Sequence, residues 1–228
     1  RFFFNHIIVL YLHLLMKILS VKTLALPEIK TVQFALFKDN RGYFTESFRK
    51  SDLAAHPALA PLAGTEFVQQ NESYSLPHTL RGLHFQWNPY MGKLIRVLFG
   101  HMIDIVADIR VGSPTFGKAI LYDMRHSPAA ESGEWIWVPP GFAHGNLFLE
   151  PTAIEYLCTG EYSQGCEAGI SPLAPDLDWT LADKTLKATF DTTVASPALI
   201  ITEKDRMGLG VKNWAADARS GNFIYGKV

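Results

Sequence analysis

The feature that most constrains the fold is a succession of short stretches rich in Val, Ile, Phe, Tyr and Trp, interrupted at close intervals by Gly, Pro, Asn and Asp. Long stretches with a periodicity of 3.6 residues are few, so long helices are not expected to build the core. Many short strands separated by turn residues are typical of an all-β sandwich or barrel. We therefore predict an all-β fold with strands over residues 31–37, 43–48, 66–73, 79–86, 93–99, 102–109, 118–123, 135–138, 145–149 and 154–159.

Two further segments accompany these strands. A helical turn is predicted to start at Ser51, a residue type that often caps a helix. Residues 163–228 are richer in Pro, Asp and Lys, and we expect them to wrap around the strands with short helices. No internal repeat stands out, and a barrel of 228 residues commonly forms one domain. We therefore expect a single domain over residues 17–228.

The first 16 residues contain an apolar run, Ile7 to Leu15, that resembles the core of a signal peptide. This run is too short to span a bilayer, and no small-residue cleavage site with good flanks follows it. Met16 and Lys17 resemble an ordinary start of translation. We expect residues 1–16 to be upstream residues or a disordered extension rather than a signal or an added strand.

The charge balance argues against some classes of partner. The chain has 21 Lys and Arg against 22 Asp and Glu, a net charge of -1, which offers no basic surface for nucleic acid or an anionic membrane. An anionic ligand must then be bound by a few local cations. Cys158 and Cys166 lack the spacing of a zinc site, so we expect free thiols in a reducing compartment. The sequence therefore predicts a cytoplasmic protein that binds neither nucleic acid nor membranes.

The segment from Gly133 to Asn146 ends in a Pro-Gly turn that is predicted to place His144 at the start of the next strand. From the residues alone, this side chain could point into a barrel or out of it. The spacing of Pro, Gly, His and Asn resembles the second motif of the cupins, which are double-stranded β-helix or jelly-roll barrels, and this favours the interior. Cupins usually bind a metal through an HxH pair and a Glu, but Gln86 stands where the second His belongs. With His84 and His144 as the candidate imidazoles, no metal site and no cofactor are expected.

A closer resemblance is to the dTDP-4-dehydrorhamnose 3,5-epimerases, whose central signature is similar to Arg81-Gly-Leu-His84-Phe-Gln followed by Gly92-Lys93-Leu-Ile-Arg-Val. Further motifs fall in the family's order between residues 30 and 205. Each motif is weak evidence, but so many in order are hard to reach by chance. They are DNRGYFTE from Asp39, FVQQN from Phe67, DIVADIR from Asp104, SPTFG from Ser113, GFAHG from Gly141, YLCTGEY from Tyr156 with the later Glu167, and TEKD from Thr202.

The resemblance implies a cofactor-independent isomerase of deoxysugar biosynthesis of the dTDP-rhamnose type. It would remove a proton from a carbon beside the keto group of a dTDP-4-keto-6-deoxyhexose and return one on the opposite face. Such a carbon acid lies on the order of ten pK units above a histidine, so the enolate needs more than about 10 kcal/mol of stabilisation. The site therefore needs a base, a cation or donor at the ketone oxygen, and an acid on the other face. The resemblance also implies a homodimer that lends strands across its interface.

The same resemblance assigns roles to individual residues. His84 would be the base, and Asp205 would accept its other imidazole N–H. Lys93 would stabilise the enolate oxygen, and Tyr156 would donate the proton on the opposite face, since a phenol stays protonated at neutral pH. Tyr162 would stack on the thymine ring. The other substrate-contacting positions are Arg41, Glu46, Gln69, Asn71, Arg81, His144, Glu167 and Lys204, among which Arg and Lys would supply the cations for a diphosphate.

Three departures from the family pattern bear on the substrate: Asn146 replaces an aromatic residue, Phe85 replaces a common tyrosine, and residues 170–176 are altered. They leave open whether C3, C5 or both are epimerised, and which sugar and base are accepted.

Three alternative functions stay open at this point. They are a 3-only epimerase for another nucleotide deoxysugar, a metal-dependent cupin isomerase or oxygenase, and a barrel that binds sugar nucleotides without catalysis. Gln86 disfavours the metal-dependent cupin. The joint presence of His84, Lys93, Tyr156 and Asp205 disfavours the barrel without catalysis.

Overall fold

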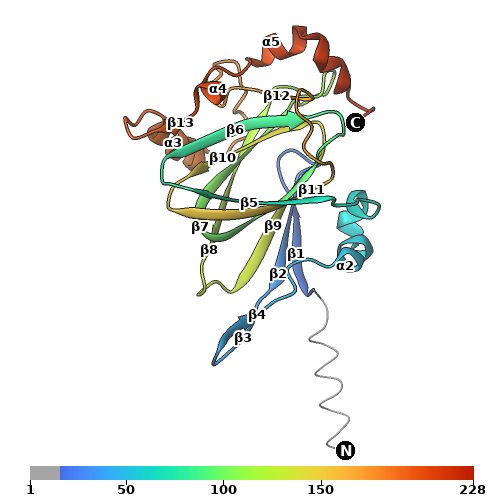
Figure 1. The fold of residues 1–228 in the computed structure, drawn as a ribbon, viewed down its shortest axis with the longest axis vertical. Coiled ribbons are helices and arrows are strands. Elements are labelled where there is room, and N and C mark those ends of the chain that lie inside the picture. The colour runs from blue at the N-terminus through green and yellow to red at the C-terminus, as the bar shows by residue number, and fades with distance from the viewer. Residues whose placement is uncertain (1–15) are drawn as a thin grey trace, which may run out of the picture.

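The computed structural model describes residues 16–228 and shows a barrel of antiparallel strands (Figure 1). Of the expected extension over residues 1–16, only Met16 is described and the rest lies outside the described residues. An 11-stranded sheet closes around the core, which confirms the predicted all-β jelly-roll barrel. Its strands are β1 (Ile18–Thr23), β2 (Lys30–Ala35), β5 (Gln69–Ser75), β6 (Thr79–Gln86), β7 (Lys93–Asp108), β8 (Ala119–His126), β9 (Ser132–Val138), β10 (Phe142–Phe148), β11 (Thr152–Cys158), β12 (Glu167–Gly169) and β13 (Ile200–Ile201).

The long strand β7 takes part in both halves of the barrel. Its residues 93–99 pair with β11, and its residues 102–108 pair with β10. Gly100 lies between these parts with a φ of +98°, and a Cβ there would collide with Pro151 and Thr152. The prediction of two strands over 93–99 and 102–109 is wrong, because Gly100 bends one continuous strand instead of ending it.

Apolar side chains fill the barrel and cover both of its outer faces. Ile95, Val106 and Phe148 belong to the cluster between the two halves. Helix α2 (Lys50–Ala55) and the turn η1 (Pro57–Leu62) cover the face of β2 and β9, where Leu53 packs in the cluster of Trp135. The opposite outer face, that of β6 and the second part of β7, is covered by the C-terminal segment.

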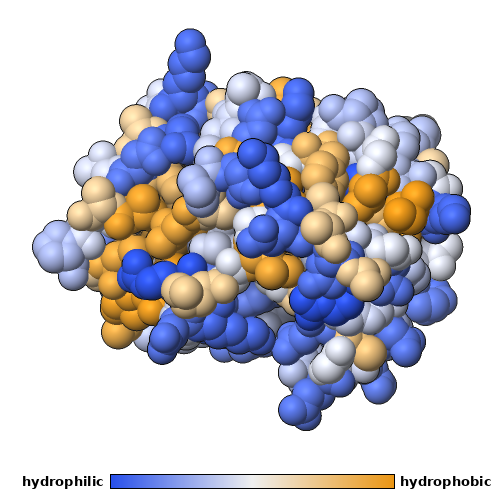
Figure 2. Space-filling model, turned by 90° about the horizontal axis from the view of Figure 1, so that it is seen from above, coloured by the Kyte–Doolittle hydropathy of each residue, from blue (hydrophilic) through white to orange (hydrophobic). Residues whose placement is uncertain are grey.

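This C-terminal segment contains α3 (Lys184–Val194), α4 (Glu203–Arg206), α5 (Val211–Ala216) and η2 (Ala218–Asn222), which lie beside β6, β12 and β13 (Figure 1). Trp214 and Phe223 from this segment pack against Phe85 of β6, and Phe190 and Leu83 belong to the same cluster. Seen from this end of the molecule, the surface is largely hydrophilic with scattered apolar patches (Figure 2). None of the helices within residues 16–228 has the length and apolar character needed to cross a membrane.

Some predicted boundaries are wrong. Helix α2 begins at Lys50 after Arg49, so Ser51 is not its N-cap. Strand β10 begins at Phe142, which places His144 inside the strand and not at its start. The predicted strand 43–48 ends at Phe44, because this segment forms a small hairpin of β3 (Phe37–Asp39) and β4 (Gly42–Phe44) outside the barrel. Strands β1, β3, β12 and β13 were not predicted.

An irregularity in β6 places two polar residues on the same face. His84 and Arg81 are three residues apart in β6, but they lie opposite residues of β10 that are two apart, so β6 contains one extra residue. In a regular strand, residues three apart point to opposite faces. The extra residue turns both Arg81 and His84 toward the same face of β6.

Glycines make this irregularity possible. Gly82 has a φ of +107°, a conformation that L side chains rarely adopt. A Cβ on Gly82 would lie 2.6 Å from the Cα of Gly145 on β10. No other residue type fits this close approach of two backbones.

We predict that Gly82→Ala destabilises the protein much more than Gly112→Ala. Both glycines have positive φ, but a Cβ on Gly112 meets nothing within 4 Å. For the control variant Gly112→Ala, the free energy of unfolding should therefore fall only by about 1 kcal/mol, the cost of the positive φ for a residue with a side chain. Gly82→Ala should lower the free energy of unfolding by roughly 1–3 kcal/mol more, because the added Cβ overpacks against β10. Urea unfolding measures both values, and equal losses would contradict the close approach described here.

Candidate functional site

A cavity of about 430 Å³ opens between β5 and β6, two strands that are not paired with each other. A second cavity of about 490 Å³ lies beside it. His84, Lys93 and Tyr156 line both cavities. These three residues therefore stand at the middle of one cleft, which extends from β13 at one end to Tyr162 at the other.

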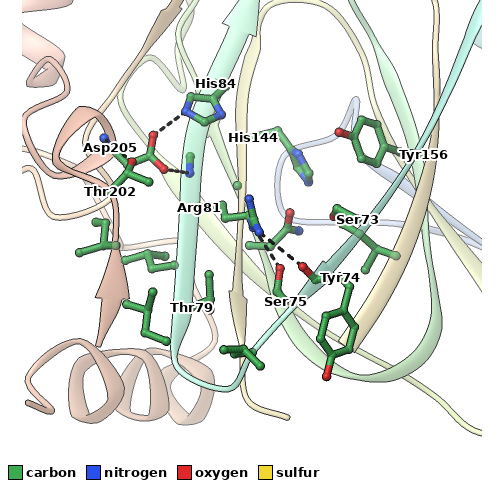
Figure 3. Close-up of a pocket in the computed structure, with 18 of the residues that line it drawn as sticks. Ser73, Tyr74, Ser75, Thr79, Arg81, His84, His144, Tyr156, Thr202 and Asp205 are labelled. Carbon is green, nitrogen blue, oxygen red and sulfur yellow. Dashed lines mark hydrogen bonds and ion pairs between the residues drawn. The ribbon is translucent and has the colours of Figure 1, made fainter. Parts of the chain in front are cut away.

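His84 and Asp205 form a hydrogen-bonded pair at the wall of this cleft (Figure 3). The Nε2 atom of His84 lies 2.7 Å from Oδ1 of Asp205, and the other carboxylate oxygen accepts the backbone N–H of Gly82 at 3.2 Å. Thr202, which caps helix α4, accepts the backbone N–H of Asp205 at 3.2 Å. The bulge of β6 and the start of α4 thus hold this carboxylate from two sides.

The charge state of Asp205 determines the tautomer of His84. Burial raises the pKa of Asp205, but hydrogen bonds from His84, Gly82 and Thr202 outweigh burial and lower this pKa below its ordinary value. An ionised carboxylate only accepts hydrogen bonds, so Nε2 of His84 carries the proton. The Nδ1 atom has no hydrogen-bond partner among residues 16–228. It is therefore free to accept a proton from a ligand in the cleft.

Tyr156 extends into the cleft from β11, on the side opposite His84 (Figure 3). Burial, together with Cys158, raises the pKa of the Tyr156 phenol, and Asn71 and Arg81 oppose this rise without cancelling it. The phenol is therefore protonated at neutral pH. It can donate a proton to the face of a ligand that is turned away from His84.

Lys93, the first residue of β7, is half-buried between these two groups. Burial lowers the pKa of the Lys93 ammonium, while Cys158, Asp104 and Glu167 partly restore it. A desolvated ammonium binds an anionic oxygen more strongly than one in water. The structure therefore brings an imidazole, an ammonium and a phenol to one cleft.

One end of the cleft has an exposed aromatic ring with polar residues around it. Tyr162 is 57% exposed, and its hydroxyl donates to Glu167 Oε1 at 3.2 Å. Lys204 donates to the same oxygen, and Gln69 accepts the backbone N–H of Tyr162 at 2.8 Å. Asn71 follows Gln69 along β5 and lines the same cavity. This end presents a flat ring face together with hydrogen-bonding groups.

Gln86 orients the loop that contains Tyr162. Its amide nitrogen donates to Pro89 O and to Glu161 O, both at 2.9 Å, and its oxygen accepts the backbone N–H of Ser163 at 2.9 Å. Gln86 therefore has a structural role at the position where cupins carry a metal ligand. Within residues 16–228, no group of three or more His, Cys, Asp or Glu side chains is placed to hold a metal ion.

A second His–Asp pair lies deeper in the cleft. His144 Nε2 is 2.7 Å from Oδ2 of Asp104, which is completely buried on β7. Asn146 donates to the same oxygen at 3.0 Å. Sequence reasoning did not assign a role to Asp104, although a single acidic residue between Ile103 and Ile105 in a predicted core strand could have drawn attention to it.

Arg81 bridges the open gap between β5 and β6. Its Nε atom donates to Ser75 Oγ at 3.0 Å, and Nη2 lies 3.5 Å from the carbonyl oxygen of Tyr74 (Figure 3). Arg81 is the cation at the end of the cleft opposite Tyr162. It lines the first cavity.

Two predicted residues lie outside the cleft of their own chain. The Arg41 side chain is 85% exposed in the β3–β4 hairpin, where it binds Asp39. Glu46 forms an ion pair with Arg49, and neither Arg41 nor Glu46 lines a cavity. Within one chain, the structure does not bring these two residues to the site.

Comparisons with known proteins show which family this chain resembles. The sequence model of the family described as dTDP-4-dehydrorhamnose 3,5-epimerase matches residues 23–213. The dTDP-4-dehydrorhamnose 3,5-epimerase of Sinorhizobium fredii is 40% identical over 152 residues, which cover 65% of this chain and 73% of that protein. The enzyme of the same name from Pseudomonas aeruginosa is 34% identical over 191 residues, which cover 81% of this chain and 92% of that protein.

Solved structures show the same relationship. The dTDP-6-deoxy-D-glucose-3,5-epimerase of Legionella pneumophila, in complex with dTDP-4-keto-L-rhamnose, matches with a TM-score of 0.71 at 31% identity. That match covers 88% of this chain and 96% of the Legionella chain. The family match spans most of the chain and includes every residue at the centre of the cleft. The chain therefore belongs to the dTDP-4-dehydrorhamnose 3,5-epimerase family.

Proposed function

We propose that this protein epimerises a dTDP-4-keto-6-deoxyhexose at the carbons next to the keto group, C3, C5 or both. The observation that carries the proposal is the placement of the His84–Asp205 pair and Tyr156 on opposite sides of one cleft, with Lys93 between them. The Legionella relative binds dTDP-4-keto-L-rhamnose, which supports this substrate class. A 3-only epimerase is the second candidate, because the cleft itself favours neither carbon.

The first step is removal of a proton from the carbon beside the ketone. Nδ1 of His84 takes this proton, while Nε2–H stays bonded to Asp205. The imidazolium that forms is stabilised by the charge of the carboxylate. The electron pair of the C–H bond moves onto the ketone oxygen, where the ammonium of Lys93 stabilises the enolate.

The second step returns a proton to the same carbon from the other side. Tyr156 donates it, because its phenol stays protonated until an enolate forms beside it. The phenolate recovers a proton from solvent, and His84 releases its own, so the cycle consumes nothing. The opposite placement of base and acid is what inverts the configuration at the carbon.

The nucleotide would bind at the exposed end of the cleft. Tyr162 offers a flat face on which a thymine ring can stack, and Lys204, which contacts Glu167 at this end, supplies positive charge for the diphosphate. Arg81, at the other end of the cleft, would contact the hexose. Gln69, Asn71, Glu167 and His144 are substrate contacts in this proposal. The cytoplasmic location expected from the sequence stays a prediction.

A homodimer would explain the position of Arg41. The β3–β4 hairpin projects from the barrel (Figure 1). Its side chains Phe44 and Tyr43 are 60% and 41% exposed. Such apolar exposure on a projecting hairpin favours contact with a second copy. In the dimer, Arg41 and Glu46 of one protomer would reach the cleft of its partner.

We predict that His84→Asn abolishes deuterium uptake from heavy water at both C3 and C5 of dTDP-4-keto-6-deoxyglucose, while dTDP still binds. Asp205→Asn should slow exchange by a large but smaller factor, since it favours the wrong tautomer and removes the charge that supports the imidazolium. The double variant should be no slower than His84→Asn alone. A double variant slower by the full Asp205 factor would show that the two residues act independently. Absence of exchange with the unmodified protein would overturn the proposed function itself.

We predict that Tyr156→Phe separates the two steps. His84 can still remove the proton, so label exchange should continue, whereas epimerisation should fall because the donor on the opposite face is gone. Nuclear magnetic resonance of the sugar protons measures both rates in one sample. Equal loss of both activities, or of neither, would remove Tyr156 from the acid role.

We predict that co-expression of Arg41→Ala and His84→Asn chains restores activity that neither has alone. In a mixed dimer, the chain with Arg41→Ala keeps its own His84 and receives Arg41 from its partner. Random pairing would return about a quarter of the activity of the unmodified protein. Asp205→Asn with His84→Asn is the control, because these two residues form one pair within a chain and should not complement each other. If the first mixture has no more activity than its two chains alone, Arg41 does not contribute to the partner's site.

A further inference from the structure

Asn146 occupies a position in the cleft that the steps above do not use. It lies on β10 opposite Arg81, is 5% exposed and lines the first cavity. His144, two residues earlier, lies opposite His84. Asn146 therefore lies next to the reacting centre, on the side away from Tyr162.

A buried carboxylate determines which way the amide of Asn146 is turned. Its Nδ2 atom lies 3.0 Å from Oδ2 of Asp104 and 3.4 Å from the sulfur of Met102. Oδ2 of Asp104 accepts this hydrogen bond, so the NH₂ group faces Asp104. The carbonyl oxygen Oδ1 is then directed away from Asp104, toward the cavity that Asn146 lines.

This carbonyl oxygen has no hydrogen-bond partner within residues 16–228. Arg81, the residue opposite, directs Nε and Nη2 to Ser75 and Tyr74 on the other side of the gap. Asn146 Oδ1 is not fully buried, so this oxygen is accessible from the cavity. An unpaired acceptor on the wall of a ligand cavity is suited to a donor on the ligand.

We infer that Asn146 is a specificity-determining residue whose side-chain carbonyl accepts a hydrogen bond from a hydroxyl group of the hexose. The inference rests on the proposed function, since it deepens the assignment of the substrate. A diphosphate does not fit this position, because phosphate oxygens only accept hydrogen bonds and the amide presents an acceptor oxygen to the cavity. The hydroxyl-bearing edge of the sugar therefore lies against β10, and the diphosphate lies nearer the exposed end of the cleft.

The test compares sugar and nucleotide binding in two variants. Asn146→Leu replaces the amide by an apolar group of similar size, and Asn146→Ala removes it without adding bulk. Calorimetry measures dissociation constants for dTDP and for dTDP-glucose, which carries the hydroxyls but does not react. Both variants should bind dTDP as the unmodified protein does and dTDP-glucose about tenfold more weakly, the usual effect of one lost hydrogen bond.

Analogues of dTDP-glucose that each lack one hydroxyl give a test without any variant. The unmodified protein should bind one of them about tenfold more weakly than dTDP-glucose, and for that analogue Asn146→Ala should cause no further loss. Unchanged affinity for every analogue would overturn the inference. So would a loss confined to Asn146→Leu, which would indicate a steric effect, or an equal loss for dTDP. If these results contradict the inference while deuterium exchange persists, the proposed function still stands.

Discussion

The close approach of Gly82 and Gly145 is the constraint on which the site depends. With no side chain on either residue, β6 and β10 come together closely enough for β6 to take up one extra residue. The extra residue turns Arg81 and His84 to the same face, and it directs the backbone N–H of Gly82 at Asp205. A regular strand would have sent one of the two polar side chains into the apolar cluster beneath the C-terminal helices.

Two buried carboxylates then orient the polar groups on the cleft wall. Asp205 holds the Nε2–H of His84 and leaves Nδ1 free, while Asp104 holds both His144 and the amide of Asn146. Each carboxylate accepts several donors, so the hydrogen atoms of these side chains have defined positions before a ligand enters. Such preorganisation lowers the cost of stabilising charge that develops during a reaction.

The sequence predicted the all-β fold and the limits of β6. The order of its motifs singled out His84, Lys93, Tyr156 and Asp205, which the structure brings to one cleft, while their catalytic roles stay a prediction. It did not predict β12 and β13, which are three and two residues long and exist only through pairing with β6. Asp104 was missed because its role follows from the register of β7 and β10, a tertiary property. The prediction of two strands over 93–99 and 102–109 fails at Gly100, because a glycine can mark either a bend within a strand or the end of a strand.

The pairing of His84 with Asp205 also affects when the protein becomes active during its synthesis. The two residues are 121 positions apart in the sequence, and the carboxylate belongs to the segment that covers the barrel last in chain order. A nascent chain that has already folded its strands on the ribosome still lacks the partner that sets the tautomer of the imidazole. The pair therefore forms only after the segment with α4 has been synthesised, and a barrel without this segment would lack the carboxylate that sets the tautomer of His84.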